Sequence, residues 1–244
     1  MINNTLLDAL IEFNQLNEHQ IYELHTPPKL VFSEHPLFFK ANELIREAIV
    51  KKRKMIVCGD YDADGIIATT IMVQTLRKLG ADVGYYIPNR FTEGYGLNVA
   101  TVEKALDKGY SFFICVDNGV SAHAALKLLN EHNAISLILD HHQIEQEVDC
   151  SHLIHPDMLD GFDQNMCGSG LSFQLSHHLI GFDAYLCSLA AIATIADVMP
   201  LWGFNRACVM AGIELINQNS YETLKPLFNK TGLINEQDIA FQLV

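Results

Sequence analysis

The sequence has little positive charge. Its 244 residues include 16 Lys and Arg against 29 Asp and Glu, which gives a formal net charge of −13. Sequence-independent affinity for nucleic acid comes from Lys and Arg side chains that neutralise phosphates, so this balance argues against a general nucleic-acid-binding surface. The compact basic run Lys51–Lys54 lies where a helix is expected to end, and we interpret it as a solvated helix terminus. Any nucleic acid must therefore be held locally.

Long apolar runs and paired cysteines are also missing. No apolar run is long enough to span a bilayer, and residues 1–13 lack the basic start of a signal peptide and carry Asp8 and Glu12. The six cysteines form no CxxC pair, which favours buried free thiols over a disulfide framework or a zinc site. With 49% hydrophobic residues, we expect a globular cytoplasmic protein of one or two domains without a membrane partner.

Apolar patterning predicts strands that alternate with helices. The predicted strands cover residues 55–59, 82–87, 111–116 and 135–139, and the helices between them cover 66–79, 98–108 and 121–132. This alternation implies right-handed crossovers and a parallel, doubly wound α/β sheet with helices on both faces. Residues 3–25 predict two short helices, residues 36–51 a third, and residues 189–198 a core helix.

Acidic residues follow three of the predicted strands. They are Asp60, Asp62 and Asp64 after the first strand, Asp117 after the third, and Asp140 with His141 and His142 after the fourth. One Asp before a helix is commonly only an N-cap, but ligands of open α/β sheets bind outside the carboxyl ends of the strands. We expect these side chains to meet at one edge of the sheet.

So many carboxylates carry more negative charge than one cation balances. The pattern therefore predicts two divalent ions, about 3.5–4 Å apart, which activate water for phosphoryl transfer. Carboxylates suit Mg²⁺ and Mn²⁺, and a histidine among them favours Mn²⁺ without deciding the choice. The loop over residues 86–98 contains one cation, Arg90, whose guanidinium suits bidentate phosphate binding; a merely solvated arginine is an equal alternative.

Five segments of the chain together resemble the RecJ branch of the DHH phosphoesterase superfamily. They are Gly59–Gly65, Tyr86–Asn98, Val116–Ser121, Asp140–His142 and Ala196–Leu201, in the order of the family. The resemblance implies a DHH phosphoesterase domain followed by C-terminal helices. It also implies a hydrolase of DNA repair and recombination, a 5′-to-3′ single-stranded-DNA exonuclease acting by two-metal-activated water, with Mn²⁺ or Mg²⁺ as cofactor and single-stranded DNA as partner.

The resemblance also assigns roles to single residues. The implied metal ligands are Asp62, Asp64, Asp117, His141 and Asp197, with Asp117 as the bridge. The implied catalytic set adds Asp60, Asp140 and His142, and the implied substrate contacts are Arg90 and His142. Asp197 enters through the resemblance alone, because by its own context it only closes an apolar helix.

Two further segments are compared with the family pattern. His155–Asp157 stands where the family usually has Asn-Pro, which leaves the contact of that asparagine open. Cys167–Gly170 resembles the Gly-rich opening of a family helix, and it is either a phosphate-contacting helix N-terminus or a plain turn.

The resemblance predicts three parts of the chain. Residues 1–35 form an N-terminal helical arm, residues 36–200 the DHH catalytic domain, and residues 201–244 a helical segment that leads toward a second domain absent from this chain. In RecJ-like proteins the further domains supply much of the grip on the single strand, so activity of this part alone is expected to be weak. Two alternatives stay open, namely a phosphodiesterase for cyclic dinucleotides or short oligonucleotides and a non-catalytic scaffold.

Overall fold

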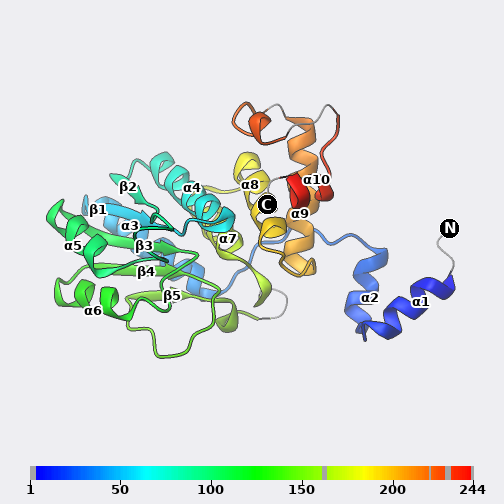
Figure 1. Ribbon diagram of the computed structural model, residues 1–244, viewed down its shortest axis with the longest axis horizontal. Coiled ribbons are helices and arrows are strands. Elements are labelled where there is room, and N and C mark those ends of the chain that lie inside the picture. The colour runs from blue at the N-terminus through cyan, green and yellow to red at the C-terminus, as the bar shows by residue number, and fades with distance from the viewer. Residues whose placement is uncertain (1–3, 161–163, 220, 229–231, 243–244) are drawn as a thin grey trace.

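The centre of the molecule is a parallel sheet of five strands, in the order β2-β1-β3-β4-β5 (Figure 1). The computed structural model describes residues 4–160, 164–219, 221–228 and 232–242. The strands are β1 (Lys54–Cys58), β2 (Val83–Tyr86), β3 (Tyr110–Val116), β4 (Ile135–Leu139) and β5 (His152–Ile154). The predicted parallel α/β sheet is confirmed, with β5 as an additional edge strand.

Helices cover both faces of this sheet, as predicted. One face packs against α3 (Pro36–Val50), α4 (Ala63–Lys78) and α7 (Gly168–Ile180), and the other against α5 (Val99–Asp107) and α6 (His123–Glu131). The strands divide their side chains accordingly, since successive residues of a strand point to opposite faces. In β3, Phe112 and Ile114 belong to the first core and Phe113 and Cys115 to the second.

The strand order creates a switch point between β1 and β3. From β1 the chain continues to β2 on one side, and from β3 it continues to β4 on the other. Such a point is where open α/β sheets bind ligands. Asp60 follows β1 and Asp117 follows β3, so the two residues flank this switch point.

The C-terminal part is helical and packs beside α4 and α7. It contains α8 (Ala184–Ala196), α9 (Gly203–Gln218), the short 3₁₀ helix η3 (Lys225–Leu227) and α10 (Glu236–Gln242), whereas the 3₁₀ helix η1 (Pro156–Met158) follows β5. The helix predicted over 189–198 begins five residues earlier, because Asp183 caps α8 by accepting a hydrogen bond from Leu186 N. Within the described part of the chain, no helix combines the length and apolar character needed to cross a bilayer.

The predicted N-terminal helices are α1 (Asn4–Phe13) and α2 (Glu18–His25); residue 3 lies outside the described residues. They project to one side of the molecule in Figure 1. Glu23 is 4% exposed, and its carboxylate accepts a 3.0 Å hydrogen bond from Gly203 N at the start of α9. The N-cap residue of α9, Trp202, offers no side-chain cap, so Glu23 satisfies a helix amide that would otherwise lack a partner.

Candidate metal centre

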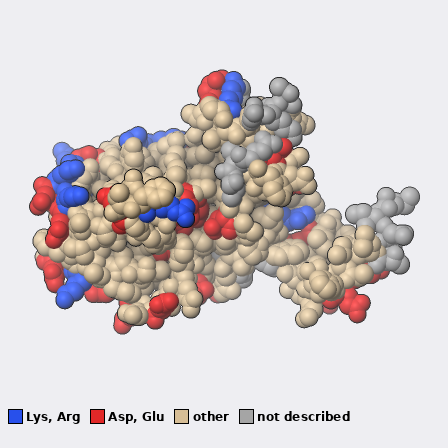
Figure 2. Space-filling view, viewed as in Figure 1, with Lys and Arg blue, Asp and Glu red and all other residues tan. Residues whose placement is uncertain are grey.

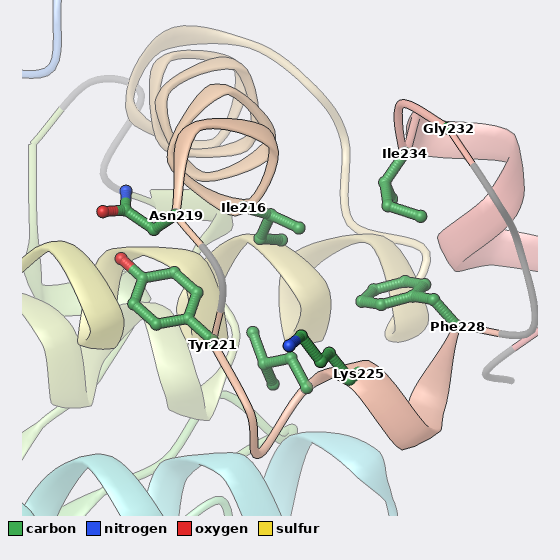
Figure 3. Close-up of a pocket in the computed structure, with 8 residues that line it drawn as sticks. Ile216, Asn219, Tyr221, Lys225, Phe228, Gly232 and Ile234 are labelled. Carbon is green, nitrogen blue, oxygen red and sulfur yellow. The ribbon is translucent and has the colours of Figure 1, made fainter.

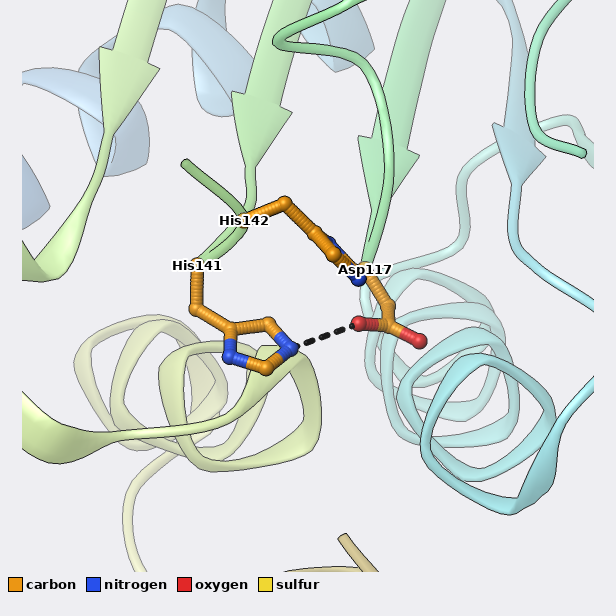
Figure 4. Close-up of side chains that lie close together, drawn as sticks. All are labelled: Asp117, His141 and His142. Atoms are coloured by element: carbon orange, nitrogen blue, oxygen red, sulfur yellow. Dashed lines mark hydrogen bonds and ion pairs between the residues drawn. The ribbon is translucent and has the colours of Figure 1, made fainter. Parts of the chain in front are cut away.

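Three carboxyl groups from distant segments surround one ring nitrogen of His141. The Nε2 atom lies 3.1 Å from Asp117 Oδ1, 3.7 Å from Asp197 Oδ2 and 3.9 Å from Asp64 Oδ2. Figure 4 shows the contact between His141 and Asp117, with His142 beside them. The four side chains come from the first turn of α4, the end of β3, the turn after β4 and the end of α8. The structure thus brings these predicted residues together.

Asp117 also belongs to a second group of carboxylates. Ligand oxygens of Asp60, Asp62 and Asp117 lie within 4.8 Å of one another. Asp62 caps α4, since its side chain accepts a 3.0 Å hydrogen bond from Gly65 N. The N-cap alternative considered for an Asp before a helix thus applies to Asp62. It is compatible with the predicted role as a metal ligand, because a carboxylate has about four acceptor sites.

The N-terminus of α7 binds Asp64. Gly168 N donates to Asp64 Oδ2 at 2.7 Å and Ser169 N donates to Oδ1 at 2.9 Å, while Ser169 Oγ donates to the main-chain oxygen of Asp64. The Gly-rich opening of this helix, considered above as a phosphate contact, thus donates these two amides to a carboxylate of the chain itself. The helix dipole adds to the attraction.

Asp140 orients its histidine neighbours. Its Oδ1 accepts from His141 N at 2.8 Å and from His142 Nδ1 at 2.8 Å, and its Oδ2 accepts from Val120 N at 3.0 Å. Burial opposes the charged form of Asp140, but the His142 and Val120 donors hold its pKa below the ordinary value. His155, which replaces the asparagine of the family, donates from Nε2 to the main-chain oxygen of His142 at 2.9 Å. Sequence reasoning did not find this role.

The loop that carries Arg90 is anchored beside the centre. Tyr95 OH donates to the main-chain oxygen of Asp117 at 2.8 Å, and the Tyr95 ring lies edge-on to His142. Arg90 is exposed, and its guanidinium lies over the ring of Tyr61, 5.2 Å from the centroid. Sequence reasoning selected Arg90 but not the two tyrosines, because aromatic residues in a loop carry no spacing signal.

The carboxyl groups repel one another strongly. The pKa of Asp117 is raised to about 12, first by burial and then by the carboxylates of Asp64 and Asp62. The pKa of Asp197 is raised to about 7 by burial and by the same two neighbours. Asp197 is also the C-cap residue of α8, where the helix dipole disfavours negative charge.

A divalent cation would relieve this repulsion. Among the described residues, Asp60 Oδ1, Asp117 Oδ2 and Asp197 Oδ2 are buried atoms without a hydrogen-bond partner, and buried polar atoms normally have one. Burial lowers the pKa of His141, which favours the neutral imidazole that binds metals. The donor set of carboxylates with one histidine fits Mn²⁺ or Mg²⁺.

A separate cavity of about 400 Å³ lies in the C-terminal part (Figure 3). Its lining includes Ile216, Tyr221, Phe228 and Ile234, with Lys225 as a cation. None of the candidate residues named from the sequence lines this cavity. The cluster of Asp and His side chains around His141 and Asp117, called the acidic group below, therefore remains the candidate functional site.

Comparison with known proteins gives consistent results. Residues 54–199 match the model of the DHH family, N-terminal domain. The single-stranded-DNA-specific exonuclease RecJ of Bacillus subtilis is 37% identical over 213 residues, which cover 84% of this chain and 27% of the relative. The RecJ of Thermus thermophilus is 36% identical over 210 residues, covering 84% of this chain and 31% of the relative. The chain therefore spans less than a third of the length of these two relatives.

Solved structures agree with this result. A crystal structure of exonuclease RecJ bound to manganese aligns with a TM-score of 0.78 at 34% identity, covering 89% of this chain and 57% of that one. Thermus thermophilus RecJ with Mn²⁺ aligns with a TM-score of 0.76 at 32% identity, covering 89% and 33%. The same protein has also been solved with Mg²⁺, and there the TM-score is 0.63 at 29% identity, covering 89% and 29%.

Proposed function

Because this chain belongs to the DHH family, we propose that it is the catalytic part of a RecJ-type phosphodiester hydrolase, which removes nucleotides from the 5′ end of single-stranded DNA. One observation carries the proposal furthest. The Nε2 atom of His141 has three carboxylates from separate segments within 3.9 Å, an arrangement that costs folding energy unless a cation uses it.

The cofactor in this proposal is a pair of Mn²⁺ or Mg²⁺ ions. The residues that would hold them are Asp62, Asp64, Asp117, His141 and Asp197, with Asp117 shared because it belongs to both groups of oxygens. When bound, such a pair lowers the pKa of a water and stabilises the charge that develops on phosphate oxygens. The RecJ structures with Mn²⁺ and with Mg²⁺ support both ions as candidates.

Three further side chains would handle the substrate. The hydrogen bond to Asp140 raises the pKa of His142, and the His142 side chain is 44% exposed, so it can offer a charged N–H to a phosphate oxygen. Arg90 can bind phosphate through two N–H groups. The Tyr61 ring beneath it offers a stacking surface for a base.

The proposed function assigns a role to two of the predicted parts of the chain. Residues 36–200 would form the catalytic domain, and residues 201–244 would lead toward a second domain that helps to hold the strand. The RecJ proteins of Bacillus subtilis and Thermus thermophilus are more than three times as long as the matched region, which supports this arrangement. The protein would act in DNA repair and recombination in the cytoplasm, where its six free thiols stay reduced.

A second candidate is a phosphodiesterase for cyclic dinucleotides or short oligonucleotides. The net charge of −13 favours it, because a short substrate needs little electrostatic attraction. On the face in Figure 2, basic side chains are few and lie among acidic ones. A non-catalytic scaffold is the weakest candidate, since it would have no use for buried carboxylates without partners.

Substitution of Asp117 tests the proposed function. We expect Asp117→Asn and Asp117→Ala to abolish Mn²⁺-dependent hydrolysis of a 5′-labelled single strand, because both remove the shared carboxylate. Asn is the better matched change, since the backbone of Asp117 has φ +59° and Asn tolerates this left-handed conformation.

The control is Asp107→Asn, an exposed acid at the end of α5, which should keep full activity. Circular dichroism checks that each variant is folded. Turnover by folded Asp117→Asn at the wild-type rate would overturn the assignment of Asp117. Products from cyclic dinucleotides but not from a single strand would support the second candidate instead.

A further inference from the structure

Cys167 lies beside the proposed metal centre, and the proposed function gives it no role. It is the N-cap residue of α7, and it is fully buried at 0% exposure. Its Sγ atom and carboxylate oxygens of Asp64 and Asp197 lie within 4.8 Å of one another. Thr194 Oγ1 is 4.0 Å from the sulfur, but this hydroxyl already donates to Ala190 O at 2.8 Å. The sulfur therefore faces the carboxylates of Asp64 and Asp197, and its closer polar contacts are with the Asp64 side chain and the backbone of Gly170.

Unpartnered oxygens next to the sulfur are an independent sign of a ligand. Asp117 is 1% exposed, and within the described part of the chain its Oδ2 has no hydrogen-bond partner. Asp117 faces the Asp64 carboxyl group, and it lies against Gly168, the residue after Cys167, so closely that a Cβ there would be 2.6 Å from Asp117 Cβ. Among the described residues, Asp197 Oδ2 also has no hydrogen-bond partner, and its contact with His141 Nε2 is 3.7 Å long. Carboxylate oxygens this close together repel one another, and a cation between them would relieve that repulsion.

The kind of cation follows from the sulfur. Mg²⁺ and Mn²⁺ prefer oxygen ligands, whereas thiolates prefer softer metals. We propose that Cys167 is a sulfur ligand for soft divalent cations, represented by Cd²⁺ and Zn²⁺, which bind it together with Asp64 and Asp197. This inference rests on the proposed function, because Asp64 and Asp197 would be shared with Mn²⁺ or Mg²⁺.

Binding would exclude the catalytic ion. As the sulfur donates an electron pair to the cation, its proton passes to solvent, so the charge and the atoms balance. A soft cation and Mn²⁺ would then compete for two carboxylates, and the metal centre would be inhibited by thiophilic ions.

Titration of the metal-depleted, reduced protein with Cd²⁺ tests this inference. Bonding of Cd²⁺ to a thiolate produces an ultraviolet charge-transfer absorption that carboxylate ligands do not give. We expect this absorption to saturate at equimolar Cd²⁺ and to disappear on addition of excess Mn²⁺. Electron paramagnetic resonance of Mn²⁺ measures the hard-ion site separately.

Two serine variants identify the sulfur. Cys167→Ser should lose the absorption and should still bind Mn²⁺. Its affinity for Cd²⁺ should fall by about tenfold or more, since even the loss of a residue that only orients a metal ligand has an effect of this size. Cys150→Ser is the matched control, because Cys150 is more exposed than Cys167 yet lies outside the acidic group. It should behave as wild type.

The outcomes separate this inference from the proposed function. An unchanged absorption in folded Cys167→Ser, or an absorption that Mn²⁺ does not displace, would overturn the assignment. If wild type binds Mn²⁺ but gives no thiolate absorption, the sulfur ligand is wrong and the proposed function stands. If wild type binds neither ion, the metal centre itself is wrong.

Discussion

Two residues of the acidic group are associated with unusual backbone conformations. Asp117 has φ +59°, and Val198, directly after Asp197, has φ +54°. Positive φ is uncommon outside glycine and is an outlier for a β-branched residue. Such strain costs about 1–3 kcal/mol and persists where the surrounding structure imposes the conformation. At Asp117, the surrounding contacts include a 2.9 Å hydrogen bond from the Asp117 N–H to Leu139 O. Observed strain at these two positions supports a functional role for the turns that present Asp117 and Asp197.

The raised pKa of Asp197 predicts how stability depends on pH. Its pKa is about 7 in the folded chain and about 3.8 as the ordinary value, so between these values the folded state binds more protons than the unfolded state. The free energy of unfolding of the metal-free protein should therefore fall as pH rises from about 4 to about 7. We expect the contribution of Asp197 to be about 1–2 kcal/mol, because its partly exposed side chain is screened by solvent.

Thermal unfolding in a chelating buffer measures this effect. Asp197→Asn should flatten the profile without making it level, since burial also raises the pKa of Asp60 and Asp117. Added Mn²⁺ should stabilise wild type more at pH 8 than at pH 5, because its ligands must lose their protons. A metal-free wild type that is most stable at pH 8 would contradict the raised pKa.

At this scale, sequence reasoning located residues according to the kind of element that precedes them. Asp60, Asp117 and Asp140 were predicted from the rule that ligands lie at the carboxyl ends of strands. Asp197 follows a helix, so only the family resemblance supplied it. Cys167 reaches the group through the tertiary packing of α7, which no local pattern encodes.

At the scale of elements, the contact between α7 and the end of β3 determines the geometry of the site. A Cβ at Gly168 would lie 2.6 Å from Asp117 Cβ and 2.8 Å from Asp117 Cα, distances that real Cβ atoms do not reach. The same residue donates its N–H to Asp64. Glycine at this position therefore allows one helix terminus to approach both carboxylates.

Gly168→Ala tests this contact. We expect a destabilisation of about 1–3 kcal/mol, as for other overpacked sites, together with weaker Mn²⁺ binding because Asp64 and Asp117 are pushed apart. Chemical denaturation and Mn²⁺ titration measure the two effects.

The matched control for this variant is Gly170→Ala in the same helix. A Cβ there would be 3.2 Å from Met166 Cβ, and alanine favours helix more than glycine does, so stability should change by less than about 1 kcal/mol. Equal effects of the two variants on Mn²⁺ binding would show that the α7 contact with Asp117 is not specific.

The elements themselves were largely predictable. The strand predicted over 135–139 coincides with β4, and the other predicted strands differ from the observed ones by one residue at one or both ends. Helix α4 begins three residues before the prediction because Asp62 caps it. Strand β5 has three residues, too few for an alternating pattern to register.

At the scale of the whole molecule, charge governs which substrates this chain can hold. The chain has a net charge of −13 and 16 Lys and Arg in all. In the proposed function, attraction for a long polyanion would therefore come from the metal ions and a few local cations such as Arg90. The matched part is less than a third of the Bacillus subtilis and Thermus thermophilus relatives.

This balance predicts how activity depends on salt and on substrate length. If few phosphates are neutralised by side chains, log(kcat/KM) should fall by less than about 2 units per tenfold increase in salt, because each neutralised phosphate of a single strand contributes about 0.7. We expect similar values for oligonucleotides of about five and about thirty nucleotides, since bases beyond the Tyr61 region would find no cationic groove. Initial rates at constant Mn²⁺ and increasing KCl measure both quantities. A steep salt dependence that appears only with the longer substrate would show that this chain holds the strand by itself, and the need for a second, strand-holding domain would then be wrong.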